Sequence, residues 1–411
     1  MSETQSGRNR AVITGLGAVT CLGGGVEGLW EGLLAGRRGL SEFAKFDPTG
    51  LRNSLCGQVR DWAFTPAEFG LHEAPDEAAQ FLLVAAAEAI ADAGLSERLH
   101  AGAERRPEVG LCIASNFAGA VSWEQYLPSV LAKEPSLEQF AQFSFGNALS
   151  LCRDVFGAAG PASQLSMACA SGTACIGLAA ELIREGQAEV VIAGGYDSLA
   201  ASPLSGLSLL RTITDDDLYP FSANRSGTLF GEGAGVLIVE SLQHARARGA
   251  RCYCEVLGSW QNNNAYHLTA PDEGGAGMAR VLAGALGKAG VAPERVAHIN
   301  AHGTGTEYHD VAETQAIKSV LGAAAYEATV VSIKGAISHL MGAAGSVEGI
   351  VAALSMFHQV VPPTVNYGEP DPECDLDYVV DGRREQRIDY AASISAGIGG
   401  DNACIILGRA D

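Results

Sequence analysis

The sequence predicts an α/β fold built from two similar units. β-Branched runs alternate with alanine-rich helical stretches along the chain, which is typical of helices that cover mixed or parallel strands. The chain has 411 residues, which is more than one ordinary domain contains. It includes 51 glycines, many of them at strand-to-helix corners. A glycine-bounded strand enters a helix once in each half, in SMACASGTACIG and again in SIKGAISHLMGAAG. We therefore expect a duplicated α/β unit.

The first unit is predicted to span residues 9–250. Its strands are expected where RAVITGLG, EVGLCIAS, AEVVIAGG and GAGVLIVES concentrate branched side chains, at residues 10–17, 108–115, 188–195 and 233–241. Its helices are expected in EAAQFLLVAAAEAIADAG and SGTACIGLAAELIREG, at residues 77–94 and 171–186.

The second unit is predicted to span residues 251–411 and repeats the alternation. Helices are expected at residues 277–290, 312–322 and 346–357, and strands at 296–303, 329–335, 391–400 and 402–408. No long Pro/Ser linker separates the halves, so we expect them to share one interface.

Composition excludes several classes of function. The formal net charge of −20 argues against a nucleic-acid partner, because phosphate binding needs a basic surface. No apolar run reaches the roughly 18–20 residues of a membrane-spanning helix, and MSETQSGRNR lacks the apolar core of a secretory signal. We expect a cytoplasmic protein without a membrane partner. Its ten cysteines, Cys252 and Cys254 included, are expected as reduced thiols, and no metal cluster is predicted.

Cys169 is the candidate nucleophile. An extended segment precedes it, and a long helix is expected to open just beyond it with Ser171 and Gly172. Unpaired N–H groups and the helix dipole favour a thiolate at such a place, so we expect a lowered thiol pKa. By itself a cysteine is more often a small buried hydrophobe, which is how Cys175 is interpreted.

The segment GPASQLSMACASGTACIG resembles the active-site segment of elongating β-ketoacyl synthases. Similar family segments follow in the same order, so the resemblance spans nearly the whole chain: YPFSANRSGTLFGEGAG, INAHGTGTEYHD, SIKGAISHLMGAAG and SISAGIGGDNACIIL. The resemblance implies a duplicated thiolase-like fold with five layers, α-β-α-β-α. It also implies an acyltransferase in which Cys169 carries an acyl thioester and condenses it with a decarboxylating malonyl group.

Two histidines and a lysine are carried over from the family. His302 and His339 each end a β-rich run at a glycine-bounded corner, from which a side chain can reach a shared cleft. The resemblance implies that they stabilise the enolate formed on decarboxylation, which two N–H donors can do. The resemblance implies that Lys334 supports the protonation states of the site. We expect its ion-pair partner to be Glu348, and Asp310 and Glu313 to lie behind His302.

The resemblance also implies a substrate cleft. Thr304 and Thr306 match hydroxyls that bind the pantetheine arm, and residues two apart can face one groove. Arg211 matches a basic residue at the tunnel mouth, although a generic surface arginine is the alternative. The backbone N–H groups of Cys169 and Ile398 are expected to form an oxyanion hole.

The gate loop departs from the fatty-acid pattern. Ala396 and Ile398 stand where fatty-acid synthases of the family commonly carry phenylalanines, and modular polyketide ketosynthases similarly place isoleucine at the gate. We therefore expect a roomier pocket and a role in polyketide or polyene/specialised fatty-acyl biosynthesis. Housekeeping fatty-acid elongation by a homodimer is the alternative.

Three rivals share parts of this pattern. A thiolase would place a second catalytic cysteine in the glycine loop, where this chain has Ile398, and chain-initiating synthases use Cys, His and Asn. A non-catalytic chain-length-factor-like subunit would lack the nucleophile. We expect an acyl carrier protein as partner, a homodimer or a heterodimer with a chain-length-factor-like subunit, and no cofactor beyond the carrier's phosphopantetheine.

Overall fold

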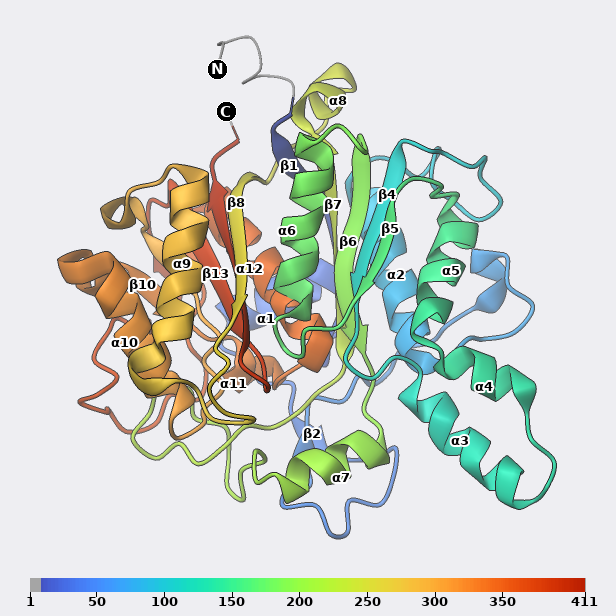
Figure 1. Cartoon of the computed structure of the whole chain (residues 1–411), viewed down its shortest axis with the longest axis horizontal. Helices are drawn as coiled ribbons and strands as arrows, with labels where there is room; N and C mark the ends of the chain where they lie inside the picture. Colours follow the sequence, from blue (N-terminus) through green and yellow to red (C-terminus); the bar gives the residue numbers. More distant parts are fainter. Residues whose placement is uncertain (1–8, 411) are drawn as a thin grey trace.

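The computed structural model describes residues 9–410, and its main feature is one mixed sheet of ten strands in the order β10-β9-β13-β14-β8-β1-β7-β6-β4-β5 (Figure 1). The strands of the first half are β1 (Ala11–Val19), β4 (Val109–Ala114), β5 (Ala162–Leu165), β6 (Val190–Asp197) and β7 (Gly233–Ser241). Those of the second half are β8 (Cys254–Asn263), β9 (His298–Asn300), β10 (Thr329–Val331), β13 (Tyr390–Ala396) and β14 (Asp401–Gly408). Two small antiparallel pairs lie apart from this sheet: β2 (Ser41–Glu42) with β3 (Leu55–Cys56), and β11 (Val360–Val361) with β12 (Arg384–Glu385).

The strand order is symmetric about its centre. Outward from the antiparallel β1–β8 pair, the first half runs β1-β7-β6-β4-β5 and the second runs β8-β14-β13-β9-β10. The orientations match as well, because β4 is parallel to β5 and β6 while β9 is parallel to β10 and β13. The prediction of a duplicated α/β unit is therefore confirmed.

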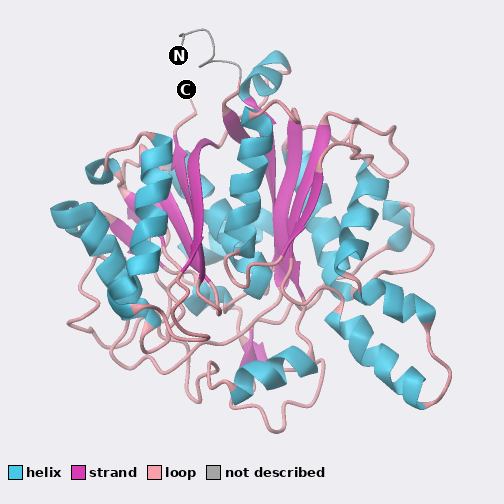
Figure 2. Ribbon diagram, viewed as in Figure 1, coloured by secondary structure: helices cyan, strands magenta, loops and turns pink. Residues whose placement is uncertain are grey.

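The central helices lie between the two halves of the sheet, and other helices cover the outer faces. The two halves of the sheet thus form the two strand layers of the predicted five-layer arrangement (Figure 2). The central helices α6 (Ser171–Arg184) and α12 (Ala344–His358) contact each other and strands of both halves. Outside them, α2 (Glu77–Asp92) covers β1, β6 and β7, while α9 (Ala276–Ala289) and the adjoining α10 (His309–Leu321) cover the second half. Nearly every residue of α12 is buried, Glu348 included, as expected of a largely apolar helix packed between strands of both halves.

The remaining helices are short or peripheral. They are α1 (Gly25–Leu34), α3 (Ala120–Leu131), α4 (Leu137–Phe143), α5 (Phe145–Phe156), α7 (Ala201–Leu209), α8 (Leu242–Ala247) and α11 (Lys334–Ile337). Single 3-10 turns form η1 (Pro66–Phe69), η2 (Glu273–Gly275), η3 (Pro293–Arg295), η4 (Gly322–Tyr326) and η5 (Met341–Ala343). Across residues 9–410 no helix is both long and apolar enough to span a bilayer.

Two glycines allow the first turns of the central helices to pack closely against each other. A Cβ on Gly172 would lie 2.4 Å from the backbone nitrogen of Ser346, and one on Gly345 would lie 2.6 Å from that of Thr173. Real side chains do not tolerate such distances, so both positions need glycine. The first turns of α6 and α12 are thereby held against each other, and the loops that enter them meet at one place.

The predicted boundary near residue 250 falls between α8 and β8, and the division into residues 9–250 and 251–411 stays a prediction. All ten cysteines lie in the described part of the chain, and none of them forms a disulfide.

Candidate active site

Cys169 lies in the turn between β5 and α6, as predicted. Ala168, just before it, has a φ of 45°, in the left-handed region that side chains rarely adopt. The hydroxyl of Ser171 fixes this turn, because it accepts from the backbone N–H of Met167 at 2.7 Å and donates to the carbonyl of Ala168 at 2.6 Å. Gly397 lies against the same turn, where a Cβ would come 2.8 Å from the Cβ of Ala168. The gate loop is therefore in contact with the nucleophile.

The expected lowering of the Cys169 pKa is wrong for this structure. Burial raises the pKa of the thiol to about 12, against the opposing effects of the Lys334 charge and of a hydrogen bond from the Ile398 backbone N–H. The side chain is 8% exposed, one residue before the Ala170 N-cap of α6. Loss of hydration thus outweighs the neighbouring positive charge. The Ile398 N–H lies within hydrogen-bond reach of the sulfur, and its predicted part in an oxyanion hole for the thioester carbonyl oxygen stays a prediction.

His302 follows β9 in a loop whose backbone is held by two buried carboxylates. Glu313 accepts from the N–H groups of His302 and Gly303, at 2.7 and 2.8 Å. Asp310 accepts from the N–H groups of Gly305 and Phe221, at 3.1 and 2.7 Å. Both carboxylates therefore lie behind His302, as the sequence predicts, and they order the loop rather than touch the imidazole.

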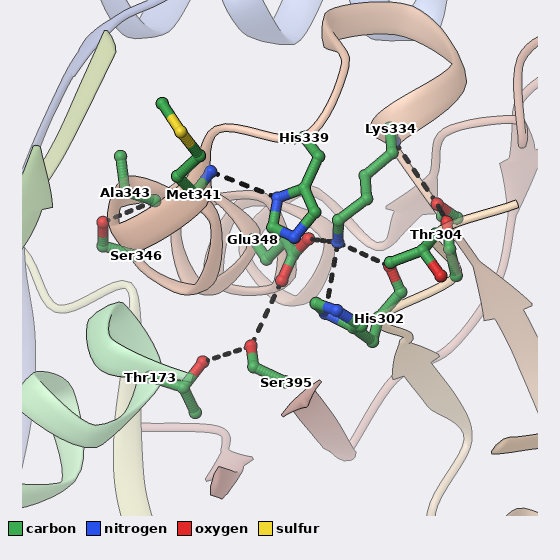
Figure 3. A network of polar contacts seen from close by, with 12 residues as sticks. Thr173, His302, Thr304, Lys334, His339, Met341, Ala343, Ser346, Glu348 and Ser395 are labelled. Carbon is green, nitrogen blue, oxygen red and sulfur yellow. Dashed lines mark hydrogen bonds and ion pairs between the residues drawn. The ribbon is translucent and has the colours of Figure 1, made fainter. Parts of the chain in front are cut away.

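Lys334, the first residue of α11, is fully buried and forms an ion pair with Glu348 of α12 (Figure 3). The predicted pair is confirmed. The ammonium also donates to the carbonyl oxygen of His302 at 2.5 Å and lies 3.4 Å from His302 Nδ1. Ser395 donates to the second oxygen of Glu348 at 3.3 Å, so both charges have partners in the interior.

His339 lies on the loop between α11 and η5. Its backbone N–H donates to the carbonyl of Leu229 at 2.8 Å, its carbonyl accepts from Gly231, and its ring stacks on Phe230 at 5.6 Å. The segment that holds it belongs to the first half of the chain. The GTLFGEGAG motif therefore positions a histidine of the second half.

The two imidazoles and the thiol meet at one point. The ligand atoms of Cys169, His302 and His339 all lie within 4.8 Å of one another, and the two rings are edge to face at 5.3 Å. His339 Nδ1 accepts from the N–H of Met341 at 3.1 Å, and His302 Nδ1 faces an ammonium, which can only donate. Both rings therefore carry their proton on Nε2. An N–H at that atom donates to an oxygen but has no lone pair for a metal ion.

Both histidines are neutral. Burial lowers the pKa of His302 and of His339 well below the usual value, and the Lys334 charge lowers both further. The Nε2 of His339 is buried and has no hydrogen-bond partner in the described protein. The site thus holds a donor without an acceptor beside the thiol, which is the arrangement needed for an oxygen that gains negative charge.

A cavity of about 700 Å³ opens onto this cluster, and the remaining predicted residues line it. Thr304 and Thr306 face it together, with their hydroxyls 2.9 Å apart. Arg211 is exposed at its wall, just past the end of α7. Ala396 ends β13, and Ile398 follows in the turn to β14. The structure therefore brings every predicted site residue to this cavity or directly behind it.

Two residues near the cavity escaped sequence reasoning. Asp197, at the end of β6, is fully buried and accepts from Ser115 Oγ and from the N–H of Gly342, both at 2.7 Å. Burial raises its pKa to about 6, against these hydrogen bonds. His309 lies beside His302 with ring centroids 5.0 Å apart. Neither position has a motif signal, because each depends on contacts between distant segments.

Comparison with known proteins defines the family. The chain matches the N-terminal domain of β-ketoacyl synthases over residues 8–245 and their C-terminal domain over residues 253–368. It belongs to the β-ketoacyl synthase family. This synthase is 38% identical to a putative polyketide β-ketoacyl synthase 1 of Streptomyces cyaneus and 38% identical to the 3-oxoacyl-acyl-carrier-protein synthase 2 of Synechocystis sp., with 97% of each chain covered in both alignments. The predicted class, an acyl-transferring condensing enzyme, is confirmed.

Solved structures agree with this assignment. The synthase superposes with a TM-score of 0.89 on a type II polyketide ketosynthase in complex with its acyl-carrier protein and bound to the hexaketide, at 32% identity over 98% of this chain and all of that one. The ishigamide ketosynthase/chain length factor structure gives a TM-score of 0.89 at 33% identity, with the same shares covered. The thiolase-like ketosynthase fold of the synthase is therefore shared along its whole length.

Proposed function

We propose that Cys169 carries the growing acyl chain as a thioester and that His302 and His339 act on the malonyl extender unit. The observation that supports this most directly is the buried Nε2–H of His339, which has no protein acceptor and lies with His302 beside the sulfur. A substrate oxygen completes that hydrogen bond. Lys334 and Glu348 support the two rings from behind.

The reaction has two stages. An acyl group first passes from its carrier to Cys169, and the carrier thiol leaves with the proton of Cys169. Malonyl-carrier protein then binds, and the bond between its α-carbon and its carboxylate breaks, so that carbon dioxide leaves and the electron pair forms an enolate. The enolate oxygen accepts from His302 and His339. Its α-carbon attacks the thioester carbonyl, and the C–S bond to Cys169 breaks. The β-ketoacyl product stays on the carrier protein, and the Cys169 thiolate takes up a proton from solvent to restore the thiol.

Intact-protein mass spectrometry tests the first stage. The synthase mixed with an acyl-carrier protein is expected to gain the acyl mass on Cys169 and to lose it when malonyl-carrier protein is added. An undiminished adduct in a Cys169→Ala variant would reject the assignment. Condensation by that variant at the wild-type rate would reject it too.

For the substrate, we propose a chain bulkier or stiffer than a saturated fatty acyl group. Ala396 and Ile398 line the cavity with small or aliphatic side chains, and Gly397 between them packs on the nucleophile turn. Phenylalanines at these positions would fill part of the 700 Å³ cavity.

A panel of carrier-bound acyl groups tests the proposal, with Ile398→Phe as the matched variant. We expect polyene or branched chains to acylate wild type faster than saturated ones, and the variant to lose that preference. A wild-type preference for short saturated chains would favour housekeeping elongation.

We also propose that a second subunit covers the outer side of β5 and the neighbouring helices. β5 ends the sheet, with β4 as its neighbour among the described strands. Exposed apolar side chains gather on α3 and α4, where Leu131 and Leu137 are 85% and 76% exposed. Such a surface is typical of subunit interfaces. The partner is a chain-length-factor-like protein or a second copy of this chain.

Sedimentation of the purified chain distinguishes the two partners. A stable, active homodimer would remove the case for a factor. An inactive monomer that becomes active when co-expressed with a chain-length-factor-like protein would establish the heterodimer. An active monomer would reject the interface.

The acyl carrier protein is proposed to dock where Arg211 meets the cavity mouth. Leu209 and Leu210, both exposed, directly precede this arginine, so the site offers one positive charge and an apolar rim on a protein of net charge −20. An acidic carrier would be attracted to such a local positive site. The proposed phosphopantetheine arm then passes Thr304 and Thr306. The predicted cytoplasmic location stays a prediction.

A further inference from the structure

His309 is a titratable side chain of the cavity wall that the two-stage reaction leaves unused, as are His267, Glu307 and Tyr308. It is the first residue of α10, and its ring stands against that of His302 with an angle of 64° between the planes. It lines the same cavity as Cys169 and His339.

Both ring nitrogens of His309 are buried and have no hydrogen-bond partner in the described protein. A neutral imidazole offers one donor and one acceptor, and leaving such groups unpaired in an interior costs about 1–3 kcal/mol. His339 Nε2 is the other histidine nitrogen of the cavity wall in this condition. That nitrogen is proposed to bind the substrate. The unpaired nitrogens of His309 therefore indicate that this ring also binds a substrate group.

His309 is neutral chiefly because it is buried. Burial lowers its pKa to about 4, and the Lys334 charge acts in the same direction. Lys334 itself faces Glu348 and His302, while the carboxylate of Asp310 is turned to the backbone N–H groups of its loop. Among the described residues that line the cavity, Arg211 is the one lysine or arginine. A substrate carboxylate deep in the site therefore meets neutral donors.

We propose that His309 donates a hydrogen bond to the carboxylate of the malonyl extender unit while His302 and His339 hold its thioester oxygen. The inference rests on the proposed function. In a malonyl thioester the two carbonyl carbons share one methylene, so the carboxylate lies beside the oxygen that His302 binds, and the adjacent ring is the one placed to meet it.

A neutral donor suits a group that must leave. When the bond to the α-carbon breaks, the electron pair moves to the enolate, and the carboxylate becomes uncharged carbon dioxide. A cation at this place would stabilise the carboxylate before reaction more than during it, which slows the step. The N–H of His309 orients the carboxylate and releases it once its charge is gone.

Two variants test the proposal. His309→Phe keeps a ring against His302 but removes both nitrogens, whereas His309→Asn restores a donor. Acylation of Cys169 is followed by intact mass, and condensation is followed as kcat and KM for malonyl-carrier protein. We expect His309→Phe to leave the acylation rate within twofold and to raise KM for malonyl-carrier protein about tenfold, as loss of one hydrogen bond to a charged group predicts. His309→Asn is expected to recover most of this loss.

Each other outcome overturns the inference. Equal losses in acylation and condensation would mean that His309 only supports the loop, and an unchanged KM would mean that the carboxylate does not touch it. If the Phe variant unfolds, His309→Leu is compared with His309→Asn in the same assays, after thermal melts show that both are folded. Failure of wild type to condense malonyl-carrier protein would instead reject the proposed function, so the two failures are distinct.

Discussion

The two halves of the synthase build different chemistry from the same corner of the fold. In the first half, residues 166–170 lead from the edge strand β5 into α6 and carry Cys169; we call this the nucleophile corner. In the second half, residues 332–343 lead from the edge strand β10 into α12 and carry Lys334 and His339; we call this the histidine corner. The symmetric strand order makes the two corners equivalent, and Gly172 and Gly345 bring them together.

The two corners differ in length, and this difference gives them different roles. The nucleophile corner is one tight turn with Ala168 in the left-handed region, so a single side chain is aimed at the cavity. The histidine corner is long enough to contain α11 and η5, which places a lysine behind the site and a histidine within it. A duplicated scaffold can therefore supply a nucleophile from one copy and charge stabilisation from the other.

Removal of the nucleophile should have the largest effect. Cys169→Ala is expected to abolish the acyl adduct and to lower condensation at least about 10⁴-fold, because the first stage has no other thiol at the site. Cys175→Ala, in the body of α6, is the matched control and should keep its adduct. If the acyl adduct were lost in Cys175→Ala and kept in Cys169→Ala, Cys175 would be the nucleophile.

Removal of the donor in the histidine corner should separate the two stages. His339→Ala is expected to lower condensation about 10²–10³-fold, the usual cost of one oxyanion donor, while acylation of Cys169 falls much less. The readouts are the adduct by intact mass and the release of carbon dioxide from malonyl-carrier protein. Equal losses in both stages would contradict the division of labour between the corners.

Lys334 connects the histidine corner to α12, and its loss should reduce stability. Lys334→Met leaves Glu348 as an unpaired buried charge, which should lower the free energy of unfolding by about 3–5 kcal/mol. Urea unfolding measures this. The double variant Lys334→Met/Glu348→Gln should recover part of the loss, because no charge then stays buried. If Lys334→Met were as stable as wild type, the Lys334–Glu348 ion pair would not form in solution.

The contact between the corners can be tested by one methyl group. Gly345→Ala should lower the free energy of unfolding by about 1–3 kcal/mol, because the new Cβ would overlap Thr173 at the start of α6. Gly287→Ala is the control, since this exposed glycine of α9 has open space around its Cβ position and should gain about 0.5–1 kcal/mol in a helix. Equal effects would mean that the corners do not touch.

The smallest expected effect is the pH dependence of Cys169 alkylation in the wild-type protein. Because burial raises the Cys169 pKa, the thiolate fraction is small at neutral pH and grows about tenfold per pH unit while pH stays below the pKa. Alkylation of Cys169 by iodoacetamide, located by peptide mass, should therefore still rise between pH 8 and 9.5. A plateau below pH 8 would show that the N-terminus of α6 outweighs burial.

Local patterns were enough for the fold class and most of the site. Alternating branched and alanine-rich segments predicted the strands and helices, because burial of an apolar face sets both periods. The SMACASG segment and the histidine motifs marked Cys169, His302, Lys334 and His339 through their resemblance to the family. The buried pair with Glu348 followed from a lysine placed after an apolar strand.

Only the tertiary structure decided what depends on distant segments. The thiol pKa rises through burial by both halves, which a helix N-terminus read from sequence does not reveal. Asp197 accepts hydrogen bonds from both Ser115 and Gly342, and the ring of His309 packs against that of His302. Neither contact produces a pattern in the local sequence. The sequence, through its resemblance to the family, selected the groups that we propose to react. Their protonation, their spacing and the third imidazole beside them were decided by packing, because solvation and distance belong to the folded chain.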